Sequence, residues 1–274
     1  VSEYAAGRTP NPCVRCNGNT KFRDLLKRGE LLGCDAIATG HYARMGTSPS
    51  GAPLLMRGLD QQKDQAYFLW GLPKTLLPQL LFPLGELTKP EVRQRARDLG
   101  LSTAEKAESQ EICFVPTGNY VDVLERKLGS GHPALSGGEL VTTTGEVVGH
   151  HDGFARYTVG QRRGVGGGHG RKLYVLGSNP ASRQVVVGSW EETYRAELRI
   201  GELNWLTDQP PAGARVGVQI RHRAPAAEAT VETLDQERIA LTFSTPQRAI
   251  APGQSAVIFS DEVVLGGGRI EREL

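Results

Sequence analysis

The chain has few cysteines and almost no excess of charge of either sign. Of its 274 residues four are cysteine, and all lie in the first half, at Cys13, Cys16, Cys34 and Cys113. A secreted disulfide scaffold carries denser cysteines across all its domains, so we expect a reducing compartment, the cytoplasm. The formal net charge is only +2, which excludes a globally basic nucleic-acid binder. Any nucleic acid must therefore be bound by local patches.

Long apolar runs, repeats and low-complexity tracts are also missing. No stretch approaches the roughly 20 apolar residues that cross a bilayer, so we expect no membrane partner. The first residues, Val1 to Tyr4, have neither the basic leader nor the apolar core of a signal peptide. The missing Met leads us to expect that the chain begins part-way through a longer protein. The remaining composition, 39% hydrophobic and 23% charged, is typical of globular proteins.

Helices and strands are expected to alternate in the first part of the chain. Apolar spacing and capping residues predict helices at 21–32, 64–70 and 89–99, with Gly33 ending the first and Thr88 and Pro90 opening the third. Apolar runs predict strands at 35–39 and 100–103, and Cys34 is expected in the core. This alternation indicates an α/β sheet, with Gly40 and His41 at the carboxyl end of a parallel strand.

After Cys113 the sequence becomes rich in glycine and β-branched residues. Strands at 174–176 and 185–187 flank the turn Ser178-Asn179-Pro180, and four more are expected at 214–223, 227–234, 238–243 and 256–260. Short strands at such spacing are typical of a small closed antiparallel barrel. We therefore expect three domains: a partial α/β domain over 1–115, a small β-rich central domain over 116–192 and a carboxyl-terminal β-barrel over 193–274.

Cys13-Val14-Arg15-Cys16 forms a CxxC motif that allows several chemistries. A redox pair would need a thioredoxin-like context, which the surrounding sequence does not clearly have. A structural zinc would need two further ligands. A nucleophile is a third reading, because Arg15 favours a thiolate and a distant cysteine could act as its partner. Two partly buried thiols without a role are the fourth.

Six strings, in order along the chain, resemble the signature of the tRNA-specific 2-thiouridylase family. They cover nearly the whole chain, and six such matches in the family's order are specific where one alone is weak. The strings are 7–17 (GRTPNPCVRCN), 38–44 (ATGHYAR), 63–69 (KDQAYFL), 108–114 (ESQEICF), 157–164 (YTVGQRRG) and 252–257 (PGQSAV).

This resemblance implies a transferase that replaces the C2 oxygen of a tRNA wobble uridine with sulfur. ATP, with Mg, would activate the oxygen, and a persulfide on Cys113 would deliver sulfur with Cys16 as the second catalytic cysteine. The sulfur would come from an upstream persulfide carrier protein or a cysteine desulfurase, and the two cysteines could finish as a disulfide. The chemistry needs two thiols, because a thiolate that attacks a sulfur–sulfur bond releases the other sulfur.

Further roles follow from the resemblance residue by residue. Gly40 matches a residue that contacts ATP, where a missing side chain permits close approach. The segment Asn11, Pro12 and Cys13 matches the one that faces the target base. The other positions that match tRNA contacts are His41, Lys63, Asp64, Gln65, Arg221, His222 and Gln254. From the residues alone, His41 could equally be a structural hydrogen-bonding group and Asp64 a helix cap.

Two departures from the family leave alternatives open. Cys13 stands where many members have Asp, so it could replace an acid or base, join Cys16 and Cys113 as ligands of a [4Fe-4S] cluster, or be a bystander. The family's phosphate-binding Ser-Gly-Gly-x-Asp-Ser string is absent, so we expect an amino-terminally truncated sheet of the adenine-nucleotide alpha-hydrolase type. Two rival functions follow: a catalytically silent tRNA-binding remnant, and an iron–sulfur or metal-binding protein.

Overall fold

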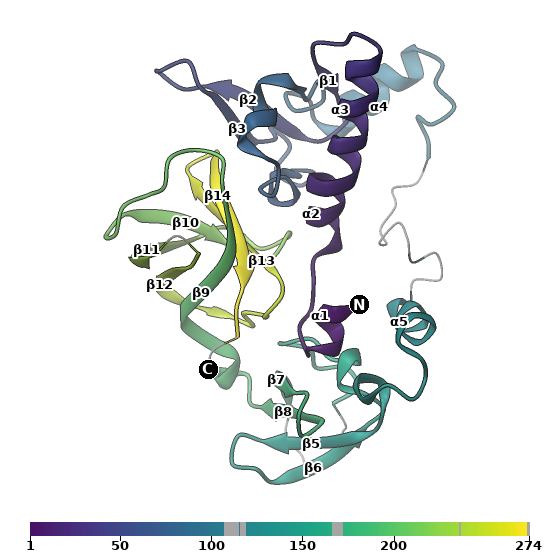
Figure 1. The fold of residues 1–274 in the computed structure, drawn as a ribbon, viewed down its shortest axis with the longest axis vertical. Coiled ribbons are helices and arrows are strands. Elements are labelled where there is room, and N and C mark those ends of the chain that lie inside the picture. Colours follow the sequence, from purple (N-terminus) through teal and green to yellow (C-terminus); the bar gives the residue numbers. More distant parts are fainter. Residues whose placement is uncertain (107–114, 116–118, 166–171, 236, 273–274) are drawn as a thin grey trace.

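The computed structural model describes residues 1–106, 115, 119–165, 172–235 and 237–272. Along the chain these residues form an α/β region, a central sheet and a β-barrel, with the barrel beside the first helices and the central sheet beyond one end of both (Figure 1). Within the described ranges, no helix has both the length and the apolar character that a membrane span requires.

The α/β region is built on one long helical column. Helix α2 (Pro12–Cys16) runs into a π-helical turn (Asn17–Lys21) and then into α3 (Phe22–Leu31), and a short α1 (Ser2–Ala5) precedes them (Figure 1). Gly33 has a φ of 69° just past the helix end, a left-handed conformation that glycine adopts readily. The predicted end of this helix is therefore confirmed.

The parallel strand predicted at 35–39 is present but short. Strand β1 (Ile37–Ala38) pairs in parallel with β4 (Leu80–Leu81), and Ile37 is buried. The helix predicted after Thr88 is also confirmed as α4 (Lys89–Asp98), where Glu91 accepts a hydrogen bond of 2.7 Å from the Thr88 N–H. The 3₁₀ turns of this region are Ala66–Phe68 and Lys74–Gln79.

Three expectations for this region are wrong. The helix predicted at 64–70 is only a 3₁₀ turn, because Asp64 accepts the backbone N–H groups of Gly58 and Ala66 and so closes a loop. No strand forms at 100–103, where Gly100, with φ of 66°, ends α4 and the chain turns. Cys34 is exposed rather than in the core, since it follows the helix end on the surface.

The central sheet contains four strands in the order β6-β5-β8-β7. These are β5 (Gly138–Thr142), β6 (Val147–His151), β7 (Tyr174–Asn179) and β8 (Gln184–Gly188), with helix α5 (Tyr120–Leu128) and the 3₁₀ turns Pro133–Leu135 and Phe154–Arg156. Strands β7 and β8 pair antiparallel, which confirms the predicted two-strand unit, but the turn lies at 180–183 because Ser178 and Asn179 are paired within β7. Val175, Val185 and Val187 are fully buried in the core of this sheet.

The barrel has six antiparallel strands in the order β13-β10-β11-β12-β9-β14, and it closes because β13 also pairs with β14. They are β9 (Tyr194–Trp205), β10 (Arg215–Gln219), β11 (Ala227–Leu234), β12 (Ile239–Arg248), β13 (Ser255–Ser260) and β14 (Val263–Ile270), after the 3₁₀ turn Glu191–Thr193. The predicted closed barrel is confirmed, but β9 and β14 were not among its four expected strands.

A hairpin from the α/β region extends the sheet of the barrel. Strand β2 (Ala43–Thr47) pairs with β3 (Pro53–Arg57), and β3 meets β14 at Met56 and Val263. The core of the α/β region therefore continues onto the barrel: Leu55 and Phe22 share one buried cluster with Val257 of β13. The part of the α/β region from Val14 to Phe82 and the barrel therefore share one continuous core.

Candidate functional site

The two cysteines of the CxxC motif lie on α2. Asn11 occupies the cap position and Pro12 the first turn, where the fixed φ of proline favours helix entry. Cys13 and Cys16 are three residues apart, so they lie on the same side of the helix. Both side chains are half-buried. The π-helical turn begins directly after Cys16, and such turns occur often at functional sites.

The turn at 66–71 supports this helix from one side. Asn17 Nδ2 donates a 3.2 Å hydrogen bond to the Phe68 carbonyl. A Cβ on Gly18 would stand 2.6 Å from the Gly71 carbonyl oxygen, so only glycine permits this approach of the two backbones. Val14 is buried in the same core cluster as Leu69. The position of the cysteines is thus set by close packing on the 66–71 turn.

The loop before α2 is hydrogen-bonded to the barrel. Gln254 Nε2 donates to the Thr9 carbonyl at 2.8 Å, and the Thr9 N–H donates to the Pro252 carbonyl at 2.9 Å. Tyr67 donates its hydroxyl proton to the Ser255 carbonyl at 2.9 Å. Burial raises the pKa of Tyr67 to about 12, so it stays a neutral donor.

A chain of ion pairs joins α1, α2 and the barrel. Arg15 lies 3.6 Å from Glu202, and Arg269 lies 3.0 Å from the same carboxylate. Arg269 Nη1 is also 3.2 Å from Glu3 Oε1, as an ion pair rather than a well-aligned hydrogen bond. Glu3 in turn accepts from Arg8 at 2.7 Å, and this bond holds the pKa of Glu3 below its usual value. These charged side chains thus form one connected chain from α1 through the barrel to α2.

Gly40 and His41 lie at the carboxyl end of β1 beside a cavity of about 420 Å³. The His41 ring stacks on Phe22 with ring centres 5.5 Å apart, and its Nδ1 is 2.8 Å from the Thr39 hydroxyl. Burial lowers the pKa of His41 to about 4, so the ring is neutral at pH 7. With Leu25 and Gln65 also on the wall, the cavity offers an apolar slot with few polar groups, which suits a flat ring.

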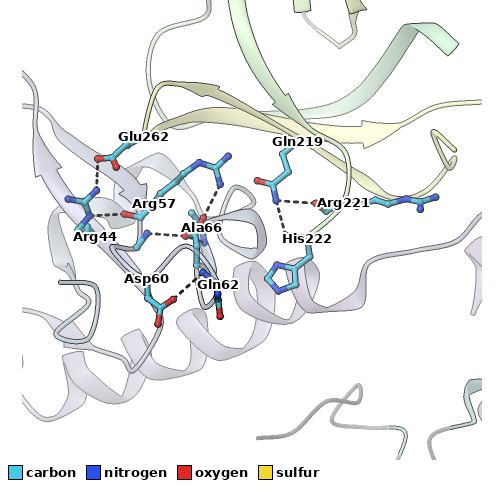
Figure 2. A network of polar contacts seen from close by, with 11 residues as sticks. Arg44, Arg57, Asp60, Gln62, Ala66, Gln219, Arg221, His222 and Glu262 are labelled. Carbon is cyan, nitrogen blue, oxygen red and sulfur yellow. Dashed lines mark hydrogen bonds and ion pairs between the residues drawn. The ribbon is translucent and has the colours of Figure 1, made fainter. Parts of the chain in front are cut away.

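The segment 63–65 already has partners within the protein. Asp64 is buried, and its carboxylate accepts from Arg57 at 2.9 Å. Gln65 Oε1 accepts the Tyr42 N–H at 3.0 Å and so anchors the turn after Gly40 and His41. Figure 2 shows the turn from Arg57 to Ala66 facing the barrel. Asp64 and Gln65 therefore stabilise the conformation of this segment through hydrogen bonds within the protein.

Arg221 and His222 follow β10 at the edge of the barrel (Figure 2). Arg221 donates to the carbonyls of Val159 and Ala249 at 3.1 and 2.7 Å, so its guanidinium joins the barrel to the central sheet region. Burial lowers the pKa of Arg221 and also that of His222. The His222 ring centre is 4.4 Å from that of Phe68, on the turn that supports the cysteine helix.

The predicted residues thus fall into three neighbouring groups joined by the 66–71 turn. The α2 group contains Asn11, Pro12, Cys13 and Cys16 with Gln254 bound to the loop before it. The cavity group contains Gly40, His41 and Gln65, and the barrel-edge group contains Asp64 and His222. Arg221 lies beside the last group, with Tyr67 and Phe68 between barrel and helix.

Cys113, the predicted partner of Cys16, lies outside the described residues. Among the residues that the structure describes, no group of three or more His, Cys, Asp or Glu could hold a metal ion. The cluster proposed on Cys13, Cys16 and Cys113 includes the undescribed position and stays a prediction.

Sequence reasoning missed Tyr67 and the ion pairs of Glu3, Glu202 and Arg269. Tyr67 lies inside the string at 63–69, so the signal was present, but nothing in that string says that its hydroxyl reaches Ser255, 188 residues away. The ion pairs carry no local signal, because their charges come from separate parts of the chain.

Comparison with known proteins divides the chain into three matched parts. Residues 1–117 match the family model of the tRNA methyl transferase HUP domain, 124–189 that of the tRNA methyl transferase PRC-barrel domain, and 195–270 that of the aminomethyltransferase beta-barrel domain.

Similarity to individual proteins extends over nearly the whole of this chain. A curated tRNA-specific 2-thiouridylase MnmA of Acidithiobacillus ferrooxidans is 48% identical over 272 residues, which cover 99% of this chain and 76% of the relative. The proteins of the same name from Solibacter usitatus and Geobacter metallireducens are both 46% identical. Those alignments cover 99% of this chain and 75% and 73% of the relatives.

Proposed function

The chain belongs to the tRNA-specific 2-thiouridylase family, and from this membership we propose that it transfers sulfur to C2 of a tRNA wobble uridine. The observation that carries the proposal is the fixed position of the free thiol of Cys16. It lies on a helix whose entry loop is hydrogen-bonded to the barrel through Gln254 and Thr9. A nucleophile needs such a fixed position, because misplacement by an ångström is costly to the rate.

The proposed reaction uses two sulfur atoms of the protein in turn. The Cys113 thiol would first be loaded as a persulfide by a sulfur carrier or cysteine desulfurase. The Cys16 thiolate then attacks the inner sulfur, so that the sulfur–sulfur bond breaks, a Cys16–Cys113 disulfide forms and hydrosulfide leaves. The hydrosulfide adds to C2, and the former C2 oxygen leaves. An external thiol must supply two electrons to reduce the disulfide before the next cycle.

ATP would supply the adenylyl group that turns the C2 oxygen into a leaving group. The cavity beside Gly40 suits the adenine part of ATP, because Phe22 and Leu25 provide apolar walls and the His41 ring is neutral. The carboxyl ends of parallel strands are the usual place for nucleotides in α/β sheets. The role of this chain's residues here is to bind and orient the ring.

The target base would be held by the α2 group. Asn11 occupies the cap position of α2 and lines a pocket together with Gly253 and Ser255, so it lies at the junction of α2 and the barrel. Cys13 lies one turn before Cys16 on the same side of the helix. This arrangement supports a role for Cys13 as a proton donor or base near the target, in place of the carboxylate of other members.

The first experiment measures 2-thiouridine in tRNA by mass spectrometry after incubation with the chain, ATP and a persulfide donor. We expect Cys16→Ser and Cys113→Ser each to lower the yield by a factor of about a thousand or more, since removing a nucleophile removes the step itself. Cys34→Ser is the matched control, because Cys34 is an exposed free cysteine away from the CxxC motif. It should keep the wild-type rate.

The outcomes separate the rival functions. Cys16→Ser with the wild-type rate would contradict the role of Cys16. Tight tRNA binding by the wild-type chain without thiolation at any ATP concentration would instead indicate a tRNA-binding protein without catalysis. Iron content and visible absorbance after anaerobic purification test the cluster. An iron-free preparation with full activity would remove the cluster as a requirement.

A further inference from the structure

A groove of about 1030 Å³ lies between the turn 57–66 and the edge of the barrel. His222 on its wall contacts the Phe68 ring, and the Phe68 carbonyl accepts from Asn17 of the helical column. The groove is therefore linked to the helical column through the 66–71 turn. Its principal lining residues are Arg57, Gln62, Gln219, His222, Arg223 and Phe259.

The charges that line the groove cancel. Three arginines face three carboxylates, and two of the arginines are already paired: Arg57 with Asp64 at 2.9 Å and Arg215 with Glu228 at 3.7 Å. Phosphate sites in proteins need an excess of positive charge. A balanced, polar groove with Phe259 beneath it fits a neutral heterocycle better than a phosphate.

Arg57 forms a fixed flat surface on this groove. Its guanidinium carbon is 3.6 Å from the centre of the Phe259 ring, and the ion pair with Asp64 holds the plane in place. The side chain is only 21% exposed, and it lines the groove. Guanidinium planes are among the surfaces on which unstacked RNA bases stack.

Gln219 provides an acceptor that lacks a donor. The residue is only 4% exposed, and its Nε2 donates to the carbonyls of Arg221 and His222 at 3.0 and 2.8 Å, which fixes the orientation of the amide (Figure 2). Its Oε1, like Nδ1 of His222, has no hydrogen-bond partner within the described residues. A buried acceptor without a donor costs free energy, so a ligand that donates here gains by restoring the bond.

We propose that this groove binds one base of the tRNA near the target uridine, stacked on Arg57 and donating an amino N–H to Gln219. The inference rests on the proposed function, because it takes the ligand to be tRNA. Adenine, cytosine and guanine carry such an amino group and uracil does not. The groove would therefore select one position of the anticodon loop for an amino-bearing base.

The test couples protein and RNA changes. Binding of an anticodon stem-loop is measured for the wild type and for Arg57→Gln, with each loop position replaced in turn by an abasic site. We expect Arg57→Gln to weaken binding of the intact RNA about tenfold, the size of one lost base stack. At one position the abasic site should weaken the wild type by a similar factor and leave Arg57→Gln unchanged.

Matched variants distinguish stacking from charge and from folding. Arg215→Gln removes a paired arginine of the same groove and should change the affinity less than about threefold, because exposed pairs contribute little. Gln219→Leu should abolish the preference for the natural base over its analogue without the amino group at the coupled position. Thermal unfolding of each variant reports its stability.

Two results would overturn the inference. The losses of affinity from Arg57→Gln and from an abasic site could add at every loop position, or the preference for the natural base over its amino-free analogue could be the same in Gln219→Leu and the wild type. If the wild type binds and thiolates tRNA but no position is coupled, the inference alone fails. If the wild type does not distinguish tRNA from an unrelated hairpin, the proposed function fails with it.

Discussion

The barrel and the α/β region bury their apolar side chains in different ways. The barrel closes on itself, and its inward residues Leu198, Leu241 and Ile258 form one cluster supplied only by barrel strands and their connections. The α/β region has a parallel pair of just two residues on each strand. Its buried cluster is completed by Val257 and Val264 on the outside of the barrel. The reactive helix is therefore carried by a region that depends on its neighbour.

Strand β13 shows how the two regions share one element. Ala256 and Ile258 belong to the cluster inside the barrel, whereas Val257 and Phe259 belong to the cluster shared with the α/β region. Successive side chains of a strand point to opposite faces, so β13 is buried on both. This explains why its sequence is a continuous apolar run rather than an alternating one.

The largest expected effect tests this dependence. Phe22 is completely buried against His41 and Phe82, and Phe22→Ala should cost about 3–5 kcal/mol of stability in the α/β region. Hydrogen exchange should show α3 and β1 opening while the amides of β11 and β12 stay protected. Leu31→Ala, at a side chain that is 87% exposed, should change stability by less than about 0.5 kcal/mol. Equal loss of protection in the barrel would contradict the comparison.

A second prediction concerns the pH dependence of stability in the α/β region, which contains the buried His41. His41 has a folded-state pKa of about 4 against 6.5 when unfolded, so the unfolded chain binds more protons between these values. Stability then falls as pH is lowered through this window, by up to about 3 kcal/mol, and is unaffected by His41 above it. Urea unfolding from pH 4 to 7 should show a shallower slope for His41→Gln. His150→Gln, at an exposed residue, is the control; the same slope in all three proteins would rule the effect out.

The smallest expected effects come from the ion pairs between the regions. Glu3 is 11% exposed and pairs with Arg8 and Arg269, so Glu3→Gln should cost about 2 kcal/mol. Because the pKa of Glu3 is lowered on folding, its contribution is present above pH 4.5 and is lost as pH falls through the folded pKa. Glu202 is 60% exposed, and Glu202→Gln should cost less than about 1 kcal/mol. Thermal unfolding at pH 7 and pH 3 checks both, and equal losses from Glu3→Gln at the two pH values would contradict the linkage.

Local signals predicted the elements that are stabilised locally. The capped helix after Thr88 and the β7–β8 unit depend on neighbours in sequence, and both are present. Strand β14 was missed because Gly266, Gly267 and Gly268 weaken a strand pattern. The structure needs small residues there, since a Cβ on Gly267 would lie 2.7 Å from the Ala256 carbonyl oxygen. That requirement comes from a partner strand and is invisible in a local window.

The candidate site shows the same limit. The strings predicted candidate residues whose roles stay predictions, and the structure places Cys16 on α2, Asn11 at its cap and Gln254 on a loop bound to its entry. Asp64 was expected at a helix start, yet it is a buried partner of Arg57 in a loop. The residues that surround Asp64 in space come from the hairpin β2–β3 and from the barrel. Long-range packing of this kind cannot be inferred from one sequence.

The π-helical turn between Cys16 and Phe22 also sets the rotation of α2 about the helix axis relative to α3. A π-turn holds one residue more than the α-helical turn it replaces, and one residue corresponds to a rotation of about 100° around the helix axis. The direction of the thiols is thereby set independently of the direction of Phe22, which the core dictates. Deleting a single residue from Asn17–Lys21 would rotate α2 against α3, and this would displace both thiols together with Val14, which is buried in the shared core. Among relatives, the length of this turn would therefore be constrained more strictly than its composition.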